Sequence, residues 1–257
     1  MNAIEQCIAL WTLSKREIRR IFLIWIHAIL PPIITVTLYF IIFGKLVGQH
    51  MVSIAGFTYM QYIAPGLIAI PMITAAYSNT SGSVYMSKFH RSIEELLISP
   101  MPNYIILLGY LSGSLFRVVF MTSLTMITAL FFTRIHIYSI SILLITLLLT
   151  STSFGLIGFL NGIFAKKFDD ASFVPVFILT PLTYLGGVFY PIQLLPSFWR
   201  HFSSLNPVYY IIDVFRYGML GTANTHPLQS LLILLGFTIS LLVLNLYILQ
   251  QGFGIRS

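Results

Sequence analysis

The sequence predicts an all-α polytopic membrane protein, and three features of its composition support this. Lys, Arg, Asp and Glu make up 8% of the 257 residues, whereas 57% are hydrophobic. Uncharged runs of roughly twenty residues separate the charge clusters, and one helix of that length crosses a hydrocarbon core of about 30 Å. Backbone polar groups in lipid must be paired internally, so helices are the expected spanning elements. Short loops use the rest of the chain, which predicts a single transmembrane domain over 1–257.

Six transmembrane helices are expected, at 22–46, 60–85, 104–132, 140–164, 171–190 and 228–250. These boundaries place most of the 14 Lys and Arg residues on one side of the membrane. Cytoplasmic loops are enriched in such residues, so both termini are predicted to face the cytoplasm. The net charge of +7 is therefore interpreted as a topology signal and not as nucleic-acid binding. Gly155, Gly158 and Gly162 in the fourth span would allow close helix contact.

An amphipathic helix is predicted over 1–21, ahead of the first span. Its apolar residues share one stripe at helical spacing, formed by Ile4, Cys7, Ile8, Trp11 and Ile18. Such a helix would lie in the headgroup layer of the cytoplasmic leaflet. The alternative is a positively charged flank of the first span.

The segment 87–101 is predicted to form a short cytoplasmic helix. Ser92 and Glu95 match a capping box, and Pro100 would end the helix. A capped helix with an apolar face, held between two spans, favours docking to a cytoplasmic partner. A solvated loop that merely connects two spans explains the pattern equally well.

The segment 190–227 is too apolar for a solvated loop, but its prolines prevent a regular span. Irregular backbone at membrane depth requires cover from protein or a watery cavity. We therefore predict two short re-entrant helices on the outer side, with a break near Asn206 and Pro207. Asp213 and Arg216 are three residues apart on the second helix, where they could pair.

Catalytic, cofactor-binding and metal-binding motifs are not found in the sequence. There is no phosphate-binding loop of the form G-x-x-x-x-G-K-[ST], so ATP hydrolysis by that mechanism is not expected. The six His residues lack metal-ligand spacing, and one cysteine, Cys7, excludes an internal disulfide. Asp169 and Asp170 are interpreted as a cap for the fifth span. Arg117 is a lone charge inside the third span, which is either a functional ion or a structurally paired or snorkelling one.

Over its whole length, the chain resembles the membrane subunit of bacterial ABC-2-type exporters, of the type V-like class. The resemblance rests on spaced positions that match the family signature, namely Leu179, Leu182, Leu185, Gly186, Val188, Leu195, Pro196, Pro207, Val208, Tyr210 and Arg216. Glu94, Glu95, Leu96 and Leu97 before Pro100 also resemble the cytoplasmic coupling segment of that family.

This resemblance implies a permease half-transporter of the bacterial inner (plasma) membrane. Two copies would pair, and each would bind a separate ATPase subunit that carries the ATP and Mg. The implied contacts with the ATPase are Arg91, Ile93, Glu94, Glu95, Leu96 and Leu97. The segment 190–227 would form an outer gate, with Pro207, Tyr210, Asp213 and Arg216 as its residues. The expected cargo is amphipathic, lipid-linked or polysaccharide-type.

Two other function classes compete with an exporter permease. A lipid-modifying membrane enzyme would need clustered acids, bases or metal ligands at one membrane face, and the sequence shows no such cluster. A secondary transporter would need ionisable groups within its spans. Only Arg117 meets that requirement by the boundaries above.

Overall fold

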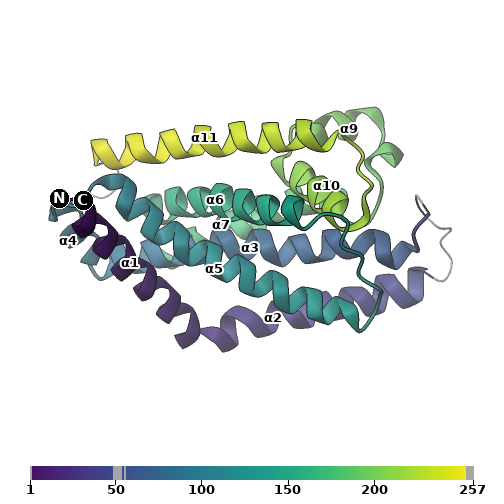
Figure 1. Ribbon diagram of the computed structural model, residues 1–257, viewed down its shortest axis with the longest axis horizontal. Coiled ribbons are helices and arrows are strands. Elements are labelled where there is room, and N and C mark those ends of the chain that lie inside the picture. The colour runs from purple at the N-terminus through teal and green to yellow at the C-terminus, as the bar shows by residue number, and fades with distance from the viewer. Residues whose placement is uncertain (1, 49–53, 55, 253–257) are drawn as a thin grey trace.

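The computed structural model describes residues 2–48, 54 and 56–252, whose regular structure is helical apart from one isolated bridge between Ile54 and Phe57. Helix α3 (Tyr59–Phe89) is the central element, packed between α5 (Asn103–Leu130) and α6 (Ile140–Phe164) (Figure 1). It begins at a capping box, in which Gln61 Oε1 accepts from the Thr58 amide at 3.0 Å. Helix α11 (Pro227–Gln251) covers α6 and α10 (Pro207–Leu220) from one side.

Four of the predicted spans are confirmed as helices long and apolar enough to cross a membrane: α3, α5, α6 and α11. The first predicted span comprises α2 (Trp25–Tyr39) and a π-helix, η1 (Phe40–Val47). It is bent by 61° from α1 (Ala3–Leu23), and the bent pair counts as a fifth candidate span.

The predicted span 171–190 consists of three short helical segments in the structure. These are α7 (Phe168–Val174), the π-helix η3 (Pro175–Leu179) and α8 (Thr180–Leu185). They do not form one long regular helix, because Pro175 and Pro181 interrupt the α-helical hydrogen bonding. The described residues therefore support four or five spans, and the sixth stays a prediction.

Glycines of α6 allow it to pack closely on α3, as the sequence predicted. A Cβ atom added at Gly162 would lie 2.7 Å from Val84 Cβ and 2.9 Å from the Ser81 carbonyl oxygen. At Gly158 it would collide with the Tyr77 carbonyl oxygen. The absence of a side chain at these positions brings the two backbones into contact, which is how helices associate in lipid.

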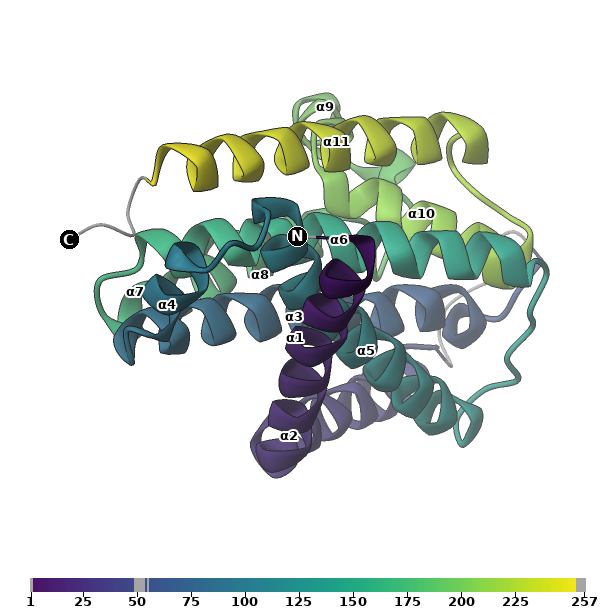
Figure 2. The same cartoon turned by 60° about the vertical axis from the view of Figure 1, so that its left-hand side comes forward.

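The short helices gather at the two ends of the bundle. The start of α1, α4 (Ser92–Ile98) and the end of α11 lie at one end (Figure 1). At the other end are η4 (Ile192–Leu194), α9 (Ser197–Ser204) and α10. Figure 2 shows that α1 crosses the bundle obliquely instead of running parallel to its long helices.

Candidate functional site

Helix α4 confirms the short helix predicted within 87–101, and Ile93 holds it against the bundle. The Ile93 side chain is buried in a cluster with Ile106, Leu107 and Tyr110, and Leu96 packs against the same cluster. Glu94, Glu95 and Ile98 are exposed on the other side. Arg91 precedes the helix with a φ of 57° and is also exposed. The side chain of Leu97 lies outside the described part of the chain.

The capping box predicted for α4 is wrong. Arg91, not Ser92, is the N-cap residue, and Ser92 is already the first helical residue. The Ser92 hydroxyl donates to the Ser87 carbonyl oxygen at 3.2 Å. Helix α3 continues to Phe89, so Ser92 follows a sharp left-handed turn and is used to tie α4 to the end of α3.

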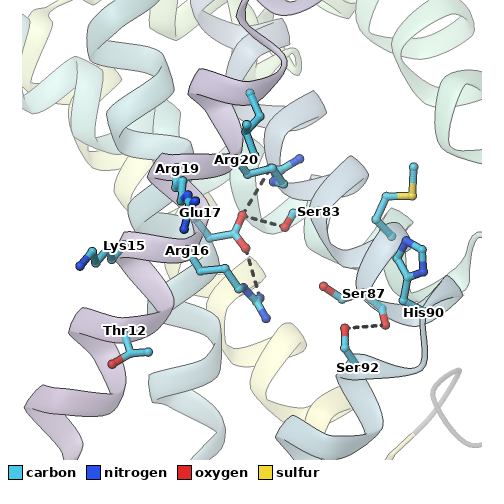
Figure 3. Close-up of a pocket in the computed structure, with 12 residues that line it drawn as sticks. Thr12, Lys15, Arg16, Glu17, Arg19, Arg20, Ser83, Ser87, His90 and Ser92 are labelled. Carbon is cyan, nitrogen blue, oxygen red and sulfur yellow. Dashed lines mark hydrogen bonds and ion pairs between the residues drawn. The ribbon is translucent and has the colours of Figure 1, made fainter.

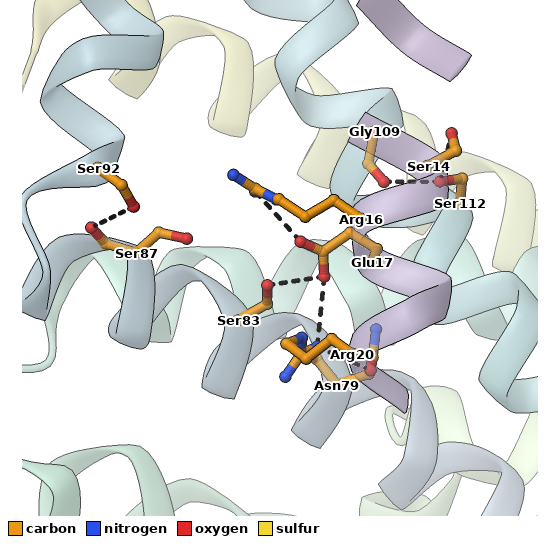
Figure 4. A network of polar contacts seen from close by, with 10 residues as sticks. All are labelled: Ser14, Arg16, Glu17, Arg20, Asn79, Ser83, Ser87, Ser92, Gly109 and Ser112. Atoms are coloured by element: carbon orange, nitrogen blue, oxygen red, sulfur yellow. Dashed lines mark hydrogen bonds and ion pairs between the residues drawn. The ribbon is translucent and has the colours of Figure 1, made fainter. Parts of the chain in front are cut away.

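A buried carboxylate at the junction of α1, α3 and α5 was not recognised in the sequence. Glu17 of α1 is only 2% exposed, and it accepts a hydrogen bond from the Ser83 hydroxyl at 2.7 Å. Its two oxygens also contact Arg16 Nη2 at 3.2 Å and Arg20 Nη2 at 3.3 Å (Figure 4). Arg20 Nη2 in turn donates to the Asn79 carbonyl and side-chain oxygens, each at 2.9 Å.

Helix α1 therefore uses two different faces. Leu13, Glu17 and Ile21 are its buried residues; α1 packs on α5, and Glu17 also reaches Ser83 of α3. Ile4, Ile8 and Trp11 from the predicted apolar stripe are exposed in the monomer. This exposed stripe fits the prediction that 1–21 lies in the headgroup layer, where lipid would cover it.

A cavity of about 580 Å³ opens beside this junction, between α1, the end of α3 and the start of α4. Its wall contains the aliphatic side chains of Leu23 and Met86 together with several cations, namely Lys15, Arg16, Arg19 and Arg20 (Figure 3). Basic and apolar groups thus share one depression at the end of the bundle that carries α4.

Arg117 lies in the middle of α5, as predicted, and is half-buried. Its Nε atom is buried without a hydrogen-bond partner, and among the described residues Arg117 forms no ion pair. Its guanidinium group is close enough to Arg20 for the two positive charges to repel each other. The structural pairing considered for Arg117 is therefore not found in the described part of the chain.

The predicted ion pair between Asp213 and Arg216 is wrong, although both residues are buried on α10. The Asp213 carboxylate accepts from the backbone amides of Asn224 and Thr225 at 2.8 and 3.0 Å. Arg216 instead donates to the Gly187 carbonyl oxygen at 2.7 Å and lies 4.2 Å over the Tyr62 ring. Each charge is used to hold a different loop against α10.

The other two residues predicted for the outer gate also lie on α10. Pro207 is its first residue and follows Asn206, whose side chain caps the helix by accepting from the Val208 amide at 3.0 Å. Tyr210 donates to the Ser204 carbonyl oxygen at 2.6 Å and so ties α10 to α9. The break predicted near Asn206 is confirmed, whereas the depth of the hairpin in the membrane stays a prediction.

Asp170 caps the first turn of α7, as predicted. Its carboxylate accepts 2.9 Å hydrogen bonds from the backbone amides of Lys167 and Lys166, and these lower the pKa of the Asp170 carboxyl. No group of three or more metal-ligating side chains occurs among residues 2–48, 54 and 56–252.

Cysteine labelling can test the arrangement of α9 and α10 in cells. After replacement of Cys7, cysteines at Ser197 and Ser204 should react with a membrane-impermeant thiol reagent, because both positions are exposed. A cysteine at Ile211 should react at least tenfold more slowly, because Ile211 is buried in α10. Equal labelling rates at the three positions would show that α10 is an open, solvated loop.

Comparison with known proteins extends over nearly the whole chain. A model of the ABC-2 type transporter family matches residues 8–220. The chain is 46% identical over 250 residues to the inner membrane transport permease YadH of Escherichia coli K12, covering 97% of this chain and 98% of that protein. It is 24% identical over 208 residues to Nodulation protein J of Rhizobium leguminosarum bv. viciae, covering 79% and 80%. The chain therefore belongs to the ABC-2 type transporter family.

Proposed function

We propose that this inner-membrane ABC-2 transport permease is half of an ATP-driven exporter. Two copies form the membrane pathway, and a separate ABC ATPase subunit with its ATP and Mg docks on each. Both termini face the cytoplasm, and the segment 190–227 closes the pathway on the outer side. The proposal rests on the family match over residues 8–220 and on the placement of α4 and α10 at opposite ends of the bundle.

Helix α4 is the observation that supports ATPase docking most directly. Ile93 anchors it to the bundle, while Glu94, Glu95 and Ile98 remain exposed as one acidic and apolar surface. Because α4 is short and begins directly after α3, a force on α4 is transmitted to the central helix. The start of α1 lies at the same end of the bundle (Figure 1).

The cargo proposed is amphipathic, lipid-linked or polysaccharide-type. The cavity beside α1 supports an amphipathic molecule, since its wall combines Leu23 and Met86 with basic side chains. Cargo of this kind would meet the permease from the leaflet on the α4 side. A gradient-driven secondary transporter is the competing class, and the experiment below separates the two.

Reversing the charge of α4 is expected to uncouple the transporter. With Glu94→Lys and Glu95→Lys combined, the permease should still insert and fold, because both side chains are exposed. Stimulation of the partner ATPase should fall at least tenfold in proteoliposomes, because an acidic docking surface has become basic.

Asp169→Lys is the matched control, because Asp169 is an exposed acid in the first turn of another short helix, α7. It should leave the stimulated ATPase activity near that of the wild type. Normal stimulation in the α4 double variant would contradict docking on α4. Uptake by the purified permease alone under an imposed proton gradient would contradict the exporter itself.

A further inference from the structure

Three buried nitrogen atoms near the centre of the α1–α3–α5 junction have no hydrogen-bond acceptor. They are Arg20 Nε, Asn79 Nδ2 and Arg117 Nε, one from each helix. Buried polar groups in proteins are almost always paired, so each such atom requires an explanation. All three are donors, so the partner that the junction lacks is a hydrogen-bond acceptor.

The three donors lie in one place because Gly113 lets the helices approach. A Cβ atom at Gly113 would lie 2.6 Å from Glu17 Cβ and 3.1 Å from Asn79 Nδ2. Asn79 contacts Arg20 directly, through two hydrogen bonds of 2.9 Å. Arg117 follows Gly113 by one turn on the same face of α5, and α5 stays beside α1 there, because the Phe22 and Phe116 rings lie 5.7 Å apart.

The charges at the junction do not balance. The Glu17 carboxylate lies at this junction, and its oxygens already contact Arg16, Arg20 and Ser83 (Figure 4). Arg117 has no counter-ion in the described part of the chain. An unpaired cation in a span is unfavourable, and a bound anion would relieve both the charge and the missing acceptor.

The cavity beside α1 reaches one side of this site. Arg20 lies in the cavity wall (Figure 3), and its guanidinium group also contacts Asn79. Leu23 and Met86 line the same wall, and apolar side chains of this kind suit an acyl chain better than a free ion.

We propose that Arg20, Asn79 and Arg117 form a binding site for the phosphate headgroup of an anionic lipid. The two guanidinium groups donate to the phosphate oxygens, as arginine does in other phosphate sites, and the Asn79 amide adds a third donor. The acyl chains leave along Leu23 and Met86 into the leaflet on the α4 side. The site stands on these contacts alone and does not depend on the proposed ATPase partner.

Thermal unfolding of the purified permease in a neutral detergent tests this site. Phosphatidylglycerol should raise the melting temperature in a saturable way, whereas phosphatidylcholine and inorganic phosphate should not. Arg117→Gln and Arg20→Gln should each weaken the apparent affinity for phosphatidylglycerol by roughly tenfold or more, the effect of one charge-assisted hydrogen bond.

Arg117→Gln also separates ligand binding from a structural role. Without lipid, this variant should melt at the same or a higher temperature than the wild type, because it removes an unpaired charge. A structural arginine would instead lower the melting temperature on replacement. Arg91→Gln is the control, since it removes one exposed charge at the same end of the bundle.

Three results would overturn the proposal. Unchanged affinity for phosphatidylglycerol in Arg117→Gln would show that the junction is not the binding site. Equal stabilisation by phosphatidylcholine would show that the headgroup charge is not recognised. Equal stabilisation by inorganic phosphate would identify a site for free anions instead of lipid.

Discussion

Replacing Glu17 by alanine is expected to destabilise the permease by about 3–5 kcal/mol, the usual effect of removing one partner of a buried ion pair. The substitution leaves the Ser83 hydroxyl without its acceptor and Arg20 without its carboxylate. Arg20 would then face Arg117 without compensation. In detergent, the melting temperature should fall by roughly 10 °C, at a few degrees per kcal/mol for a chain of this size.

A second substitution shows that uncompensated charge is the cause. Adding Arg20→Gln to Glu17→Ala should recover part of the lost stability, because the Arg20 guanidinium group is no longer left without its carboxylate. Glu94→Ala is the matched control, since Glu94 is an exposed carboxylate and its loss should change stability by less than about 0.5 kcal/mol. Equal melting temperatures for Glu17→Ala and Glu94→Ala would contradict a buried role for Glu17.

The long helices could be predicted from the sequence because their signal is local. Uncharged runs long enough to span lipid leave few alternatives, and the predicted range 140–164 coincides with α6. The region 171–190 was harder, since Pro175 and Pro181 divide it into segments whose hydrogen bonding depends on the surrounding helices. Hydropathy does not report such a change in helix type.

The polar contacts were mispredicted because their partners are distant in sequence. Asp213 and Arg216 have the spacing of a helical ion pair, but the loop residues Asn224 and Gly187 compete successfully for them. Glu17 lies among four Lys and Arg residues within 15–20, a pattern typical of a solvated cluster. Its burial depends on Ser83, which is 66 residues away.

These errors share one physical origin. A charged residue in a membrane protein is stable only where the fold supplies its partners, and those partners come from other helices. In this permease they are supplied at both ends of α3: Ser83 meets Glu17 near one end, and Tyr62 meets Arg216 near the other. Because α3 also packs along α6, a displacement of α3 would affect both groups of polar contacts.

Replacing Gly158 by leucine is therefore expected to prevent folding of the bundle. A side chain at this position of α6 collides with the Tyr77 carbonyl oxygen and lies 3.1 Å from the Ser81 amide nitrogen. Both obstacles are backbone atoms of α3, so no rotamer change relieves them, and the helices must separate. Overpacking of this kind costs more than about 3 kcal/mol.

Size-exclusion chromatography and thermal unfolding of the purified variants measure this effect. Gly158→Leu should yield aggregated protein or no cooperative transition. Gly236→Leu should behave like the wild type, because Gly236 in α11 has no atom within 4 Å of an added Cβ. Both substitutions raise helix propensity and hydrophobicity equally, so they differ only in what the new side chain meets. A normally folded Gly158→Leu variant would show that α3 and α6 do not pack through this glycine, and the central position of α3 would have to be revised.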